Sequence, residues 1–220
     1  MRYVRVLAVT AFLLTMAFTG SALADSTVTL NLTGVGDNNG GGVYTYPYYF
    51  SINGSPSTTS LICDTFDNDV TVGETWQATV SGLLSGTGLF GVNTQKYEAA
   101  GLIFDDILAG KIDPTVGNWA IWGLFSNSAA SNTFYTSSGA ADLTSTYMGM
   151  ALNADPGQFS NLVLYTPIDG SQSEGGCPQE FIGVAMPEPG TLAFLMITLL
   201  FGAAVFAFRK QLGVKYAVNA

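Results

Sequence analysis

The chain has 220 residues, with sixteen acidic side chains, seven basic ones and no histidine, and its formal net charge is −9. Such an acidic protein repels the phosphate backbone, so the composition excludes nucleic-acid binding. The lack of histidine removes the commonest general base and metal imidazole. We therefore expect a non-enzymatic protein with no catalytic residue, no cofactor and no metal site.

The N-terminus has the pattern of a secretory signal peptide. Arg2 and Arg5 form a basic start, Val6 to Phe18 is apolar, and Ala22 and Ala24 provide the small residues of a cleavage site. An uncleaved anchor is the alternative, but the Ala-x-Ala ending favours cleavage. Export of the following segment is the consequence.

The expected organisation is a signal peptide over residues 1–24 and an exported domain over residues 25–186. All sixteen acidic residues lie between Asp25 and Glu188, together with only Lys96 and Lys111 of the seven basic ones, so this stretch carries a formal charge of −14. Its length suits one domain with a hydrophobic core.

Hydrophobic periodicity predicts a mainly β fold for the exported domain. Alternation and β-branched or aromatic composition predict strands, and apolar residues at three- and four-residue spacing predict helices. The expected strands are Ser26–Leu32, Val43–Ile52 (with an edge or bulge at Pro47), Leu61–Phe66, Thr75–Val80, Asn161–Thr166 and Glu180–Ala185. The expected helices are Thr94–Leu108, one starting at Asp113-Pro114, and Ala140–Leu152. This order favours an antiparallel β-sandwich or barrel with a helical insertion, an α+β arrangement.

Aromatic side chains are concentrated in the second of these strands. Tyr44, Tyr46 and Tyr48 could form a ligand surface that stacks on sugar rings, or could pack between strands. An acidic grouping, Asp64, Asp67 and Asp69, has the oxygen ligands of a calcium site without EF-hand spacing, and we interpret it as a solvated loop.

The chain contains two cysteines, Cys63 and Cys177, both in the exported segment. Disulfides persist in oxidising compartments, so one bridge between them is an expectation. A buried thiol together with a separate loop thiol is the alternative, since spacing alone does not decide between the two.

The C-terminal region contains a hydrophobic segment long enough to span a membrane as one helix. Thr191–Phe208 is apolar throughout and is followed by Arg209 and Lys210. The basic residues place the final stretch, 211–220, in the cytoplasm and the preceding domain outside.

A proline motif stands immediately before this segment: Pro187, Glu188, Pro189 and Gly190. Together with the apolar run and the basic pair, it resembles the PEP-CTERM sorting signal of Gram-negative bacteria, over residues 187–210. The resemblance implies export, transient anchoring in the inner membrane with the domain in the periplasm, and processing by an exosortase. Delivery to the cell surface or to the exopolysaccharide matrix would follow.

A second resemblance lies within the exported domain. Cys63-Asp64 and Asn118-Trp119-Ala120-Ile121-Trp122 are similar to the thioester domains of bacterial adhesins, which join a strand cysteine to a glutamine ahead of a helix. Asn118 stands where that glutamine is expected. The resemblance implies a mixed β and helical fold, while a structural Cys63 with Trp119 and Trp122 in the core is the alternative.

These observations lead to one main functional expectation and one alternative. The chain is expected to be a non-enzymatic exported protein that an exosortase processes and that reaches the surface or the biofilm matrix. The alternative is an adhesin-like or carbohydrate-binding surface module, with exopolysaccharide as its partner.

Overall fold

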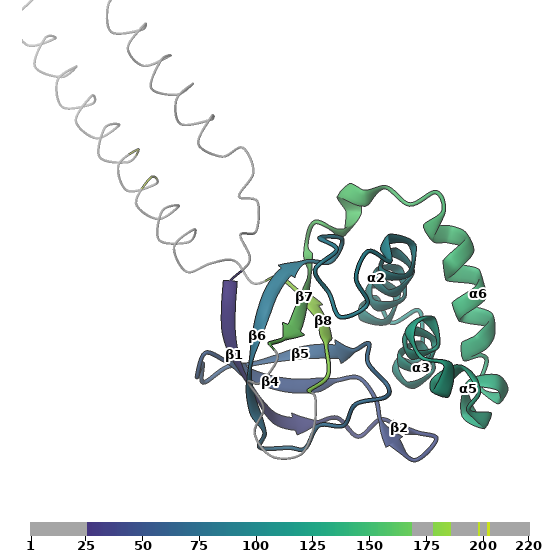
Figure 1. Ribbon diagram of the computed structural model, residues 1–220, viewed down its shortest axis with the longest axis horizontal. Helices are drawn as coiled ribbons and strands as arrows, with labels where there is room; N and C mark the ends of the chain where they lie inside the picture. Colours follow the sequence, from purple (N-terminus) through teal and green to yellow (C-terminus); the bar gives the residue numbers. More distant parts are fainter. Residues whose placement is uncertain (1–25, 169–177, 186–197, 199–201, 203–220) are drawn as a thin grey trace, which may run out of the picture. The chain divides into compact units, whose positions relative to one another are not determined.

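The computed structural model describes residues 26–168, 178–185, 198 and 202. Within this part of the chain, six strands form a closed antiparallel barrel (Figure 1). Around the barrel they follow in the order β1 (Ser26–Val35), β4 (Tyr48–Ile52), β5 (Thr58–Cys63), β8 (Phe181–Val184), β7 (Leu162–Pro167) and β6 (Thr75–Gly82). The predicted mainly β fold is confirmed, and of the two architectures considered the barrel is the one observed.

The interior of the barrel is filled by aromatic side chains. Phe50 of β4 lies 5.6 Å from Trp76 of β6 and 4.7 Å from Phe181 of β8, measured between ring centroids. Because β4, β6 and β8 are not neighbours in the sheet, these contacts cross the inside of the barrel. A barrel of this size is closed by packed side chains and has no open channel.

The helices follow one another between β6 and β7. They are α2 (Thr94–Leu108), α3 (Pro114–Phe125), α4 (Asn127–Ala130), α5 (Thr133–Ser137), α6 (Ala140–Ala151) and the 3-10 helix η1 (Pro156–Phe159). Figure 1 shows α2, α3, α5 and α6 together on one side of the barrel. The predicted helical insertion is therefore confirmed.

Local signals explain the bounds of the main helices. The Asp113 side chain accepts hydrogen bonds from the backbone N–H groups of Thr115 and Val116, at 3.0 and 3.1 Å, and Pro114 occupies the first helical position of α3. The predicted α2 is confirmed at both ends, and the third predicted helix is α6 with one residue fewer. Neither α4 nor α5 was predicted, because helices of four and five residues are too short to show a period.

The aromatic stretch differs from its prediction as a single strand. β2 (Asn39–Gly40) and β3 (Val43–Tyr44) form a separate hairpin, and the barrel strand β4 begins only at Tyr48. Pro47 lies between them, and a proline offers no N–H to a strand ladder. The tip of the hairpin needs two residues in the left-handed region, and Gly41 and Gly42 provide them with φ of 65° and 86°.

The bounds of β5 are also shifted relative to the prediction. The strand starts at Thr58, ahead of the predicted start at Leu61, and ends at Cys63, so Asp64 to Phe66 lie beyond it. Thr58 and Thr59 pair with Ser51 and Phe50 of β4. Polar β-branched residues extend this strand, because threonine suits an exposed position on a pleated surface.

The two predicted terminal signals lie outside the described residues. This applies to the signal peptide with Ala22 and Ala24, to the sorting motif with its basic pair, and to the predicted spanning helix apart from Thr198 and Gly202. Among the described residues, no helix has the length and apolar character needed to cross a membrane.

Candidate functional site

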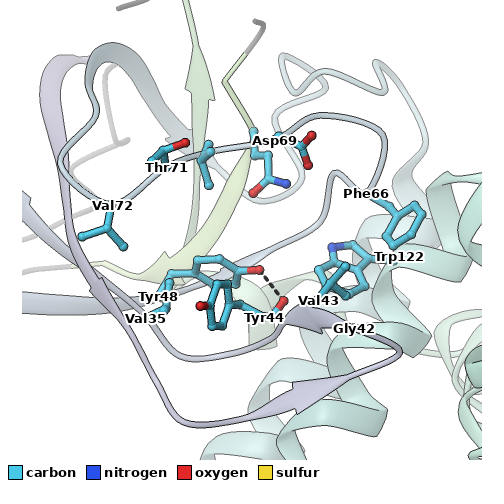
Figure 2. A pocket seen from close by; sticks show the side chains of 12 residues that line it. Val35, Gly42, Val43, Tyr44, Tyr48, Phe66, Asp69, Thr71, Val72 and Trp122 are labelled. Atoms are coloured by element: carbon cyan, nitrogen blue, oxygen red, sulfur yellow. Dashed lines mark hydrogen bonds between the residues drawn. The ribbon is translucent and has the colours of Figure 1, made fainter. Parts of the chain in front are cut away.

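A pocket of about 450 Å³ lies where the β2–β3 hairpin, the loop after β5 and the helix α3 meet (Figure 2). The residues that give it chemical character are Tyr44, Tyr48, Phe66, Asp69, Trp122 and Gln179. They come from five separate parts of the chain, so the pocket exists only once the barrel and the helical insertion have packed together. Aromatic walls with a few polar groups are the usual composition of a ligand site.

The hairpin wall of the pocket is held against α3. The indole N–H of Trp119 donates to the carbonyl of Gly40, at 3.1 Å. A Cβ atom at Gly41 would lie 2.7 Å from the Trp119 ring, so only glycine allows this approach. The Trp119 ring is itself packed edge-on against Trp122, with centroids 5.2 Å apart. Trp119 thus acts as a core residue that positions both the hairpin and Trp122.

The predicted aromatic ligand surface is divided by the structure. Tyr44 and Tyr48 line the pocket, whereas the ring of Tyr46 is packed edge-on against Phe104 of α2, with centroids 5.6 Å apart. The Tyr48 hydroxyl donates to the Tyr44 carbonyl at 2.7 Å, as Figure 2 shows. Burial raises the pKa of Tyr48, which keeps this donor protonated. The Tyr44 ring is 57% exposed and is free to contact a ligand.

Two buried polar atoms in the pocket lining have no hydrogen-bond partner within the described part of the chain: Nε1 of Trp122 and Oε1 of Gln179. Both residues are almost fully enclosed, with 2% and 6% of their surface exposed. The Cys63 sulfur lies near the Trp122 indole but is a weak acceptor. A buried donor or acceptor without a partner is costly, and apart from the weak contact with Cys63 the described residues provide none for these two atoms.

The loop after β5 does not gather its carboxylates into a cation site. Asp64 is fully buried, whereas Asp67 and Asp69 are exposed. Among the described residues, no group of three metal-ligating side chains is close enough to hold an ion. Of the three, only Asp69 lines the pocket.

Asp64 instead forms a buried acid pair with Glu180. The register of β5 and β8 pairs Ile62 with Ile182 and Cys63 with Phe181, so the next residues along each strand direction are Asp64 and Glu180. Both are completely inaccessible to solvent, and their carboxyl groups are hydrogen-bonded to each other. Two carboxyl groups in contact share one proton, because two buried negative charges at this distance repel strongly.

The hydrogen-bond partners of the pair show which member holds the proton. Glu180 accepts from the Tyr97 hydroxyl at 2.7 Å, from the Leu89 N–H at 2.9 Å and from the Thr166 hydroxyl. These donors suit a carboxylate. Asp64 accepts from the Thr65 hydroxyl at 3.0 Å, and among the described residues its Oδ2 has no donor. We therefore assign the proton to Asp64, which donates it to Glu180.

The electrostatic environment agrees with this assignment. The pKa of Asp64 is raised well above its ordinary value, first by burial and then by the charge and hydrogen bond of Glu180. The pKa of Tyr97 is also raised, chiefly by burial and then by Asp64 and Glu180, so its hydroxyl stays a donor. Because Tyr97 belongs to α2 and Glu180 precedes β8, the pair ties the helical insertion to the barrel.

Cys63 and Asn118 are brought together, but through the backbone of Cys63. The side-chain amide of Asn118 donates to the Cys63 carbonyl and accepts from the Tyr46 N–H, both at 2.8 Å. The Cys63 side chain is fully buried, and its sulfur lies 3.2 Å from the carbonyl oxygen of Thr65. Burial raises the pKa of this thiol. Asn118 thus links α3 to β5 and to the segment before β4.

The predicted disulfide involves a residue outside the described part of the chain, and two residues of the pocket were not predicted. Cys177 lies outside the described residues, so its bridge to Cys63 stays a prediction. Trp122 and Gln179 were not predicted as site residues. Trp122 was recognised only as a core residue of its helix, and nothing local to Gln179 indicates that it lines a pocket together with a residue of a distant helix.

Comparison of the chain with protein-family models, with curated proteins and with solved structures found no significant match.

Proposed function

We propose that this chain is a non-enzymatic exported protein that is delivered to the cell surface or the exopolysaccharide matrix, where its barrel domain binds carbohydrate in the pocket beside α3. The observation that carries the binding function is the pocket itself, in which an exposed Tyr44 ring stands near the unpaired polar atoms of Trp122 and Gln179. The terminal segments of the sequence support export and sorting.

A binding role fits the chemistry of the pocket better than a catalytic one. The chain has no histidine, and the acid pair Asp64–Glu180 is fully buried and does not line the pocket. Its proton takes part in holding two parts of the fold together. The side chains that do line the pocket provide stacking and hydrogen bonds without a nucleophile and its base.

Sorting is tested by fractionating cells with and without the exosortase. We expect a shortened protein in the surface or medium fraction of the strain with the enzyme, and full-length protein in the inner membrane of the strain without it. Full-length protein of unchanged location in both strains would contradict the sorting part of the proposal. Intact mass of the recovered protein would also establish both ends of the chain and the state of Cys177.

Binding is tested by retention of the protein on exopolysaccharide from the producing bacterium. Tyr44→Ala is expected to weaken retention about three- to tenfold, because an aromatic contact is worth roughly 0.5–1.5 kcal/mol. Tyr49→Ala is the matched control, since Tyr49 is also partly exposed on β4 but does not line the pocket. Equal retention of wild type and a protein of similar charge without the domain would rule out the function.

A further inference from the structure

The unpaired atoms in the pocket have complementary hydrogen-bonding chemistry. An indole N–H can only donate, and an amide oxygen can only accept. The orientation of the Gln179 amide is set on its other side, where Nε2 donates to the carbonyl of Asn68. Since a carbonyl can only accept, Oε1 is the atom left unpaired. A hydroxyl group both accepts and donates, so it has the chemistry to pair with both atoms.

The charges around the pocket select among hydroxyl-bearing ligands. Asp69 contributes a carboxylate to the lining. The two lysines of the described region are elsewhere: Lys111 is paired with Asp106 at 2.7 Å, and Lys96 lies over the ring of Phe125. The pocket therefore offers no cation to a carboxylate, sulfate or phosphate, and the acidic domain repels such groups. An uncharged ligand fits, and the Asp69 carboxylate can accept a hydrogen bond from one of its hydroxyl groups.

The walls of the pocket provide apolar surface beside these polar groups. The exposed Tyr44 ring lies at the rim, and Phe66 contacts Trp122 with ring centroids 5.3 Å apart. Figure 2 shows the indole nitrogen of Trp122 on the side of the ring that faces Tyr48. A sugar ring presents both a C–H face and a set of hydroxyl groups, so it matches an aromatic rim with a polar interior.

Resting on the proposed carbohydrate-binding function, we propose that the pocket is specific for an uncharged sugar residue, one hydroxyl of which bridges the Trp122 N–H and the Gln179 amide oxygen. A second hydroxyl donates to Asp69, and the ring lies against Tyr44. Uronic-acid and sulfated polysaccharides are excluded by the acidic lining.

The test compares retention of the full-length protein, purified in detergent, on columns of neutral polysaccharide (dextran, starch and cellulose) and of alginate. We expect retention on at least one neutral polymer and none on alginate. Trp122→Phe removes the N–H while keeping an aromatic ring, and should weaken retention on that polymer about tenfold, the equivalent of one hydrogen bond. Trp76→Phe is the control, because Trp76 is also a buried tryptophan with an unpaired N–H but lies inside the barrel and does not line the pocket.

A second variant keeps the test informative if Trp122→Phe does not fold. Asp69 is exposed, so Asp69→Lys should fold, lose retention on the neutral polymer and gain retention on alginate. Retention of wild type on alginate as strong as on neutral polymers, or undiminished retention of folded Trp122→Phe, would overturn this inference and leave the proposed function in place. Retention on none of the polymers and none on the native exopolysaccharide would overturn both.

Discussion

Asp64→Asn is expected to make the protein more stable at neutral and alkaline pH, by about 1–3 kcal/mol, the scale of a hydrogen bond to a charged group. An asparagine keeps the geometry of the site: its amide N–H₂ donates to Glu180, and its oxygen still accepts from Thr65. Urea unfolding followed by tryptophan fluorescence between pH 4 and 9 measures the difference.

The sign of this effect follows from the raised pKa of Asp64. The unfolded chain loses this proton near the ordinary value of 3.8, whereas the folded protein keeps it to higher pH. The contribution of Asp64 to stability is therefore complete below about pH 3.8 and is lost progressively as the pH rises through the folded value. Asparagine does not titrate, so the advantage of the variant should grow from about pH 4 upward.

The partner of Asp64 should respond in the opposite direction. Glu180→Gln places an N–H₂ group where the protein supplies three donors, from Tyr97, Leu89 and Thr166. We expect a loss of about 1–3 kcal/mol, since a buried donor is left without its acceptor. Asp67→Asn, in the same loop as Asp64 but exposed, should change little. If Asp64→Asn destabilised the protein as much as Glu180→Gln, the proton would not be on Asp64.

Asn118→Ala is expected to be the most damaging of the proposed substitutions, with a loss of about 2–5 kcal/mol. It leaves the Cys63 carbonyl and the Tyr46 N–H without partners and adds a small cavity at a fully buried position. Each unsatisfied buried group costs about 1–3 kcal/mol. The chemical denaturation midpoint of the purified protein measures this loss.

Asn127→Ala provides the matched control for Asn118. Asn127 is exposed at the start of α4, so its replacement should shift the midpoint only slightly. If Asn118→Ala were as mild as the control, the amide would not be the link between α3, β5 and the segment before β4. The protein would then be expected to join its helices and barrel mainly through apolar packing.

Local features of the sequence were sufficient for the elements but not for the site. The period of Thr94–Leu108 and the cap at Asp113 are each contained in a few consecutive residues, and both helices formed as predicted. Val43–Ile52 was predicted as one strand, but Pro47 separates the hairpin strand β3 from the barrel strand β4. Strand composition alone does not show which sheet a strand joins.

The pocket and the acid pair depend on contacts between distant segments. Trp122 and Gln179 meet only because β8 returns to the barrel beside β5 after the helical insertion. Asp64 faces Glu180 through the register of those two strands, which pairing with β4 and β7 sets. Register is a property of the folded sheet, so the sequence could suggest the aromatic wall with Tyr44 and Tyr48 but not the polar groups that complete it.

The most direct measurement for the central claim is a titration of the full-length protein, isotopically labelled at its three tryptophans, with the neutral oligosaccharide that it retains. We expect the indole N–H signal of Trp122 to move on binding, while that of Trp119, bonded to Gly40, stays in place. Binding that leaves the Trp122 signal unchanged, or that moves the Trp119 signal equally, would contradict the account.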